Sequence, residues 1–144
     1  MIYTDKTKRA IKLCFKAHEG QVDKSGLPYV HHPLHLAEQM DDEDSTIVAL
    51  LHDVVEDTDY TIKDLKEMGF GDAVIEAINL MTHRPGVPYM DYVKEIAKNP
   101  IARKVKLADL NHNSDLTRLN HEPTSQDLER VKKYKQAKEL LEKE

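Results

Sequence analysis

Apolar side chains recur at helical spacing along almost the whole chain, and the alternation typical of strands is nearly absent. The predicted helices cover residues 4–19, 33–40, 43–55, 61–69, 72–81, 89–98, 99–119 and 124–144. Helix-start signals support this division, because Thr61 to Asp64 has the form of a capping box and Asn99 precedes Pro100. We therefore predict an all-α fold, a single helical bundle of about seven or eight helices over residues 1–144.

Ionisable residues interrupt the third predicted helix, which is otherwise apolar. His52 and Asp53 directly follow the aliphatic run 47–51, and Glu56 and Asp57 come one turn later. Buried charge is expensive unless it is paired or binds a metal ion. The pattern therefore predicts a metal site on a buried helix.

Composition and charge narrow the class of protein. Of the 144 residues, 40% are hydrophobic and 33% are charged, as in an ordinary soluble domain. We expect no membrane span and no signal peptide, and the single cysteine, Cys14, fits a cytoplasmic protein. The net charge of −5 argues against nucleic-acid binding but is compatible with a small anionic substrate. The sequence gives no indication of the oligomeric state.

Four residues are candidates for a shared metal ion: His32, His52, Asp53 and Asp109. Two imidazoles and two carboxylates suit manganese, iron or another divalent cation better than a structural zinc ion. Spacing alone brings together only His52 and Asp53. On the predicted helix 99–119, Lys106, Asp109 and Asn113 share one face, which is either the edge of a site or a solvated surface.

The chain resembles the HD-domain metal-dependent phosphohydrolases, and within them the hydrolase domain of the RelA/SpoT alarmone enzymes. Four ordered blocks carry the resemblance, at residues 17–21, 24–33, 49–58 and 105–109. The resemblance implies that His32, His52, Asp53 and Asp109 bind a metal ion, manganese in the alarmone hydrolases, and that Glu56 and Asp57 are the catalytic acidic pair. Our candidates for phosphate and nucleoside contacts are Lys24, Ser25, Tyr29, Arg84, Lys106 and Asn113.

Three positions depart from the alarmone-hydrolase pattern. Many of these enzymes have basic residues where this chain has Asp23, Leu110 and Asp115. We interpret the metal core as intact and the nucleotide pocket as altered. One hypothesis is that Asp23 accepts hydrogen bonds from guanine.

The resemblance implies a stand-alone guanosine-3′,5′-bis(diphosphate) 3′-pyrophosphohydrolase with a role in the bacterial stringent response. Two alternatives remain open at this point. One is a phosphohydrolase that acts on another nucleotide or phosphoester, for example NADPH. The other is a regulatory module that binds metal and nucleotide without turnover.

Overall fold

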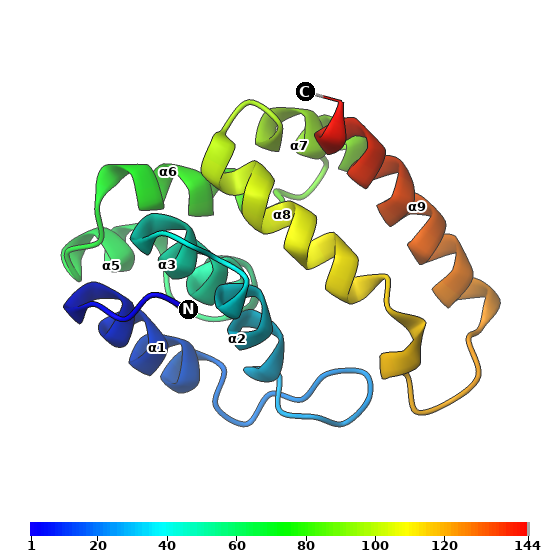
Figure 1. Cartoon of the computed structure of the whole chain (residues 1–144), viewed down its shortest axis with the longest axis horizontal. Helices are drawn as coiled ribbons and strands as arrows, with labels where there is room; N and C mark the ends of the chain where they lie inside the picture. The colour runs from blue at the N-terminus through cyan, green and yellow to red at the C-terminus, as the bar shows by residue number, and fades with distance from the viewer. Residues whose placement is uncertain (144) are drawn as a thin grey trace.

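The third predicted helix forms the centre of the molecule. In the computed structural model, which describes residues 1–143, every residue of α3 (Glu43–Leu51) from Ser45 to Leu51 is buried. Four helices pack around it, namely α1 (Asp5–Ala17), α2 (His31–Glu38), α6 (Asp72–Met81) and α8 (Pro100–Asn113) (Figure 1). A helix that is apolar on nearly all sides must be enclosed in this way.

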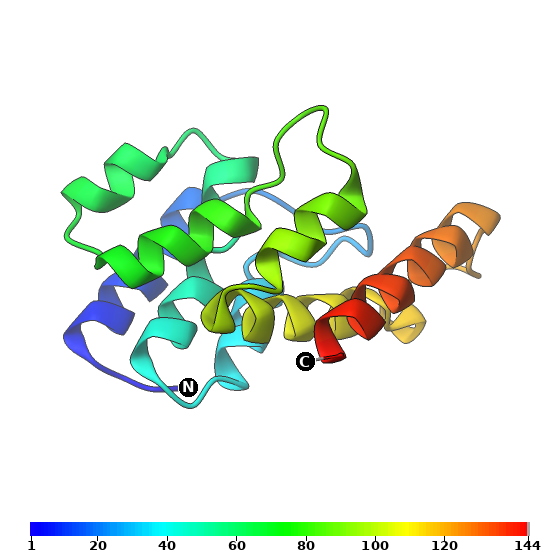
Figure 2. The same cartoon turned by 90° about the horizontal axis from the view of Figure 1, so that it is seen from above.

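The remaining elements extend this core at its two ends. A single turn, α4 (Val54–Asp57), follows α3, and α5 (Ile62–Glu67) packs on α6. At the other end α7 (Tyr89–Ile96) and α8 contact the long α9 (Ser125–Glu142), and a 3-10 turn, η1 (Leu116–Arg118), lies between α8 and α9. Figures 1 and 2 place α9 at the end of the molecule opposite α1.

The all-α prediction is confirmed. Each predicted range contains helical structure, and residues 1–143 contain only one isolated β-bridge, between Val22 and Pro28. Within these residues no helix combines the length and apolar character that crossing a membrane requires. Residue 144, at the end of the last predicted helix, lies outside the described residues.

The prediction of one continuous helix over 43–55 is wrong. The helix is interrupted at His52 and Asp53, and Asp53 has φ −103° and ψ 0°. This bridge region of backbone space is sparsely populated and is a common conformation for active-site residues. The interruption divides the predicted helix into α3 and α4, so the aliphatic core and the acidic turn lie on separate elements.

Two other boundaries differ from the predictions. The helix beginning at Pro100 ends at Asn113 rather than Leu119, because the Asp115 carboxylate accepts from the Thr117 backbone N–H at 3.0 Å and starts η1 instead. The second helix begins at His31, two residues before Pro33, because the first turn of a helix does not need the missing N–H of proline.

Candidate functional site

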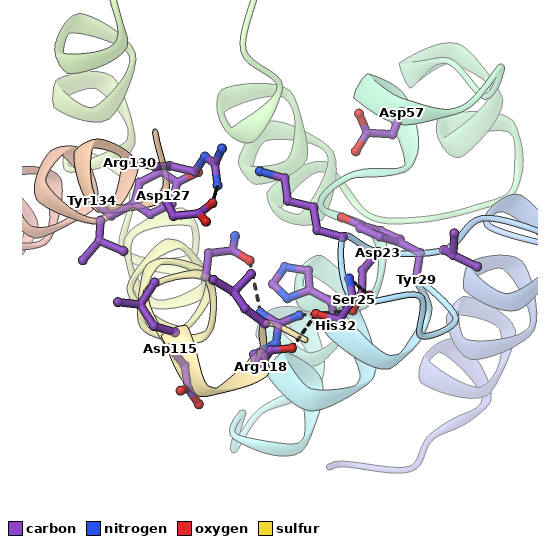
Figure 3. Close-up of a pocket in the computed structure, with 16 residues that line it drawn as sticks. Asp23, Ser25, Tyr29, His32, Asp57, Asp115, Arg118, Asp127, Arg130 and Tyr134 are labelled. Carbon is purple, nitrogen blue, oxygen red and sulfur yellow. Dashed lines mark hydrogen bonds and ion pairs between the residues drawn. The ribbon is translucent and has the colours of Figure 1, made fainter. Parts of the chain in front are cut away.

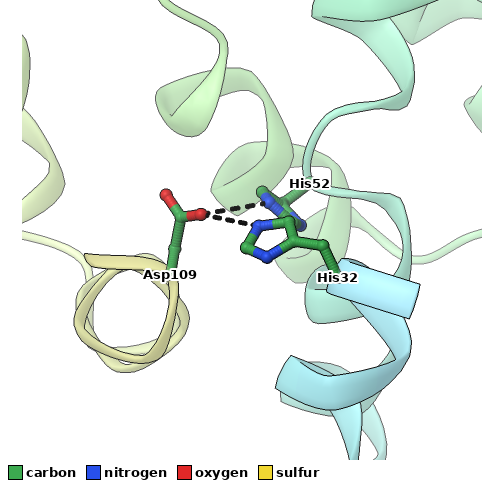
Figure 4. Close-up of side chains that lie close together, drawn as sticks. All are labelled: His32, His52 and Asp109. Atoms are coloured by element: carbon green, nitrogen blue, oxygen red, sulfur yellow. Dashed lines mark hydrogen bonds and ion pairs between the residues drawn. The ribbon is translucent and has the colours of Figure 1, made fainter. Parts of the chain in front are cut away.

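Three predicted ligands from separate parts of the sequence meet in the interior of the protein. His32 comes from α2, His52 from the end of α3 and Asp109 from α8 (Figure 4). Asp109 Oδ1 lies 2.9 Å from His32 Nε2 and 3.7 Å from His52 Nε2. All three residues are buried, and their potential ligand atoms lie within 4.8 Å of one another. Packing of α2 and α8 on α3 therefore creates a cluster that the spacing of these residues did not predict.

The fourth predicted ligand, Asp53, lies at the edge of this cluster. Its Oδ2 atom is 3.0 Å from His52 Nε2 and accepts a hydrogen bond from the Tyr29 hydroxyl. Asp53 also belongs to a neighbouring group with Glu56 and Asp57, whose carboxylates are again within 4.8 Å of one another. Asp53 thus connects the buried cluster to the acidic turn α4.

The orientation of the His52 ring supports a cation at this position. Its Nδ1 atom faces the Ala49 carbonyl at 2.7 Å and must therefore carry the proton. In that tautomer the lone pair of Nε2 faces two carboxylates, and this nitrogen has no hydrogen-bond partner among the described residues. Such an arrangement is unfavourable unless a proton or a metal ion lies between the nitrogen and the carboxylates. The residues present therefore fit a divalent cation.

Further side chains hold the three central residues in place. Asp109 accepts from Lys106 Nζ at 2.9 Å and from Asn113 Nδ2 at 3.0 Å. The Nδ1 atoms of His32 and His112 are 2.7 Å apart, and burial and the charge of Arg118 lower the pKa of His112 to about 3. Contacts of this kind fix the orientation of metal ligands. Lys106 and Asn113, which we expected to contact substrate, both contact Asp109.

The buried charged groups of the cluster shift one another's pKa values strongly. Burial alone would raise the pKa of Asp109, but the positive charge of Lys106 and the hydrogen bond with His32 hold it well below its usual range. Burial would likewise lower the pKa of His52, but Asp53 and Asp109 raise it well above the ordinary value. Burial, followed by the charges of Asp53 and Glu56, raises the pKa of Asp57 to about 6. A carboxyl group with this pKa can exchange a proton near neutral pH.

A cavity of about 460 Å³ opens beside the cluster (Figure 3). His32 and Asp57 line it, together with four of the predicted substrate contacts: Lys24, Ser25, Tyr29 and Asn113. The Ser25 hydroxyl donates to the Arg118 backbone carbonyl, so it joins two walls of the cavity. A volume of this size is typical of small-molecule sites.

Two predicted residues do not line this cavity. Arg84 is exposed, donates to the Asn79 side chain and lines a different depression, with α5 and α6. Glu56 is also exposed, and its Oε1 accepts from the His83 backbone N–H at 2.6 Å. Asp57 is therefore the member of the acidic pair that faces the cavity.

The sequence analysis did not predict that residues from the C-terminal third of the chain line the cavity. Arg118, Asp127, Arg130 and Tyr134 all line the cavity. Asp127, Arg130 and Tyr134 are spaced three and four residues apart, so they share one face of α9. That spacing is present in the sequence and is a usable signal for a shared face.

The three departures from the alarmone-hydrolase pattern have different surroundings. Leu110 is a core residue with 1% exposure, whereas Asp115 is exposed at the cavity rim. Asp23 Oδ1 accepts from the backbone N–H groups of Ser25 and Leu27, at 2.8 and 3.0 Å, so this oxygen is occupied within its own loop. This arrangement leaves only the other oxygen of Asp23 for the guanine contact that we hypothesised.

The sequence matches one protein family and is similar to several known proteins. A family model described as HD domain matches residues 10–135. The chain is 36% identical over 148 residues to a GTP pyrophosphokinase of Streptomyces coelicolor, covering 94% of this chain and 16% of that protein. It is 33% identical over 152 residues to a guanosine-3′,5′-bis(diphosphate) 3′-pyrophosphohydrolase of Aquifex aeolicus, covering 97% of this chain and 20% of that protein.

The fold also matches a solved structure. That structure is described as a metazoan ortholog of SpoT that hydrolyses ppGpp, and it aligns with a TM-score of 0.81 at 24% identity, over 99% of this chain and 89% of the other. At this identity the match concerns the fold alone. The chain spans only about a sixth to a fifth of the length of the two curated relatives.

Proposed function

Because the chain belongs to the HD-domain family, whose members bind divalent metal ions, we propose that it is a metal-dependent phosphohydrolase that removes pyrophosphate from the 3′ position of guanosine-3′,5′-bis(diphosphate). One observation supports this most directly: the buried His32, His52 and Asp109 cluster lies beside a cavity lined by Asp57 and basic side chains. The name of the Aquifex relative supplies the substrate and the position of cleavage.

The proposal includes a specific metal and a set of ligands. His32, His52, Asp53 and Asp109 would hold Mn²⁺, which suits mixed imidazole and carboxylate donors. When bound, the ion supplies Lewis-acid chemistry, because it polarises a phosphoryl oxygen and makes a water molecule easier to deprotonate. We also include a single catalytic domain over residues 1–144 and a cytoplasmic location in the proposal.

The side chains of the protein would carry out the proton transfer and the positioning. Asp57, with its pKa raised to about 6, would accept the proton of the water that attacks phosphorus. Glu56 completes the proposed catalytic pair and also anchors the segment after α6 through His83. Lys24, Arg118 and Arg130 would face the phosphates, and Tyr29 would hold Asp53 in place.

Release of pyrophosphate tests the proposal. We expect the protein with Mn²⁺ to convert guanosine-3′,5′-bis(diphosphate) to GDP and pyrophosphate, and Asp53→Ala to abolish this reaction. Addition of a chelator should stop the reaction, and excess Mn²⁺ should restore it. Nucleotide binding without any turnover would favour a regulatory module instead, and release from a different nucleotide would favour another substrate.

A further inference from the structure

The cavity contains carboxylates that already pair with its guanidinium groups. Arg118 Nη2 lies 3.6 Å from Asp23 Oδ2, and Arg130 Nη1 lies 3.1 Å from Asp127 Oδ1. All four residues line the cavity. The two arginines are therefore partly neutralised before any substrate enters.

The pair between Asp23 and Arg118 is rigidly held. Asp23 Oδ1 accepts two backbone N–H groups of its own loop, so the carboxylate has a fixed orientation. Arg118 Nη1 donates to the His112 carbonyl at 2.9 Å. The two side chains are only 13% and 21% exposed, so solvent screens their attraction less than it would at the surface. Figure 3 shows both beside His32, near the buried cluster.

The pair between Asp127 and Arg130 is fixed by the start of α9. Asp127 Oδ2 accepts from the Thr124 backbone N–H at 2.9 Å as part of a capping box, while Oδ1 contacts Arg130. The Asp127 side chain is 9% exposed and that of Arg130 is 31% exposed. The capping geometry thus places a carboxylate at the cavity wall next to the guanidinium group.

Lys24 differs from the two arginines. Its ammonium group forms no ion pair within the described residues, while burial and the nearby charge of Arg130 lower its pKa. A phosphate entering the cavity therefore meets one uncommitted cation and two neutralised ones. Charge-assisted hydrogen bonds to phosphate are strong only when the guanidinium group is free to form them.

We propose that Asp23 and Asp127 are specificity-determining residues. This inference rests on the function proposed above. The two residues reduce the affinity of the cavity for the 5′ phosphate chain, the chain that does not react. A carboxylate already bound to an arginine competes with the incoming phosphate and also repels it. The enzyme should therefore accept a guanosine 3′-diphosphate with a shorter 5′ chain nearly as well as the bis(diphosphate).

Isosteric amide variants test this role. Asp23→Asn and Asp127→Asn remove the charge but keep an oxygen that accepts the backbone N–H groups. Asp115→Asn is a matched control, because Asp115 lines the same cavity and accepts from Thr117 but forms no ion pair in the described part of the chain.

Kinetics with two substrates measure the preference. For the unmodified protein, kcat/KM for guanosine 5′-diphosphate 3′-diphosphate and for guanosine 5′-monophosphate 3′-diphosphate should agree within about threefold. Each of Asp23→Asn and Asp127→Asn should lower KM for the longer substrate by about fivefold, with a smaller change for the shorter one. The inference is overturned if neither variant changes this ratio, or if Asp115→Asn changes it equally.

Calorimetric titration with GDP separates this inference from the proposed function. GDP carries the 5′ chain without the reacting group, and its Kd should fall by about fivefold in both variants but not in Asp115→Asn. Tighter GDP binding together with no hydrolysis of either substrate would uphold the charge effect and refute the hydrolase. Unchanged GDP binding in an enzyme that hydrolyses both substrates would support the hydrolase and refute the charge effect.

Discussion

Lys106 and Asp109 form a buried ion pair across one turn of α8, with Nζ 2.9 Å from Oδ2. Their side chains are 11% and 8% exposed. The same carboxylate faces two imidazoles through its other oxygen, so Lys106 supplies the positive charge that keeps Asp109 ionised before a metal ion binds.

Replacement of this lysine should destabilise the metal-free protein strongly. Lys106→Met leaves a buried carboxylate without its cation, which should lower the free energy of unfolding by about 3 kcal/mol. The loss should be smaller with saturating Mn²⁺, because the ion would take over part of the neutralisation. Urea denaturation with chelator and with Mn²⁺ measures both values. The control is Lys104→Met, which removes an exposed partner of Asp41 and Asp42 and should have little effect. Equal losses for the two variants would contradict a special role for Lys106.

Removal of the Tyr29 hydroxyl should weaken metal binding without unfolding the protein. The hydroxyl donates to Asp53 and so fixes one proposed ligand. Tyr29→Phe should raise the Kd for Mn²⁺ by about tenfold, as is common for groups that orient ligands. Titration calorimetry gives the Kd, and circular dichroism checks the helix content. Tyr3→Phe is the control, since Tyr3 is 67% exposed. An unchanged Kd in Tyr29→Phe would mean that the hydroxyl does not position Asp53.

The proton acceptor should determine how hydrolysis depends on pH. The pKa of Asp57 is raised to about 6, and only its ionised form can take a proton from water. We therefore expect kcat to fall as the pH drops through about 6, and Asp57→Asn to lose turnover.

Asp57→Asn should stabilise the folded protein at neutral to alkaline pH even though it abolishes turnover. A carboxyl group whose pKa is raised by folding favours the folded state at low pH and loses that contribution as the pH rises through about 6. At pH 8 the uncharged amide should therefore raise the denaturation midpoint. A variant that is inactive and also less stable would indicate a structural role instead.

Lys24 and Arg84, both predicted from the sequence to contact substrate, should differ in their effect on KM when replaced by alanine. Lys24 lines the cavity, so Lys24→Ala should raise KM for the nucleotide by about tenfold. Arg84 lines another depression, so Arg84→Ala should leave KM unchanged. Steady-state kinetics at fixed ionic strength compare the two variants. Equal effects would mean that the loop containing Arg84 reaches the substrate.

The helices were predictable because each one depends on local information. Periodic apolar residues and capping signals such as those at Thr61 and Asn99 are present in the sequence, and these two caps form as predicted. The interruption at His52 and Asp53 was not predictable in this way. His52 contacts His32 of α2 and Asp109 of α8, and the Asp53 carboxylate accepts from Tyr29 in the preceding loop. Local spacing encodes none of these contacts.

The site was predictable only in part for the same reason. The family resemblance placed His32 and Asp109 beside His52, and these three residues do meet. The wall formed by Arg118 and Arg130 depends on the early end of α8, which turns the chain through η1 and brings α9 to the cavity. Neither guanidinium group belongs to a block that carries the resemblance.

The interruption between α3 and α4 separates residues that differ in how well they tolerate substitution. Residues 45–51 are enclosed, so truncation of an aliphatic residue there costs about 2–5 kcal/mol. Glu56 and Asp57, only a few positions later, are exposed and support no part of this core. Substitutions of these two acidic residues can therefore change the reaction with little loss of stability, whereas Val54, at the start of α4, is part of the core. This acidic turn is the segment in which new chemistry could be selected or engineered most easily on the existing scaffold.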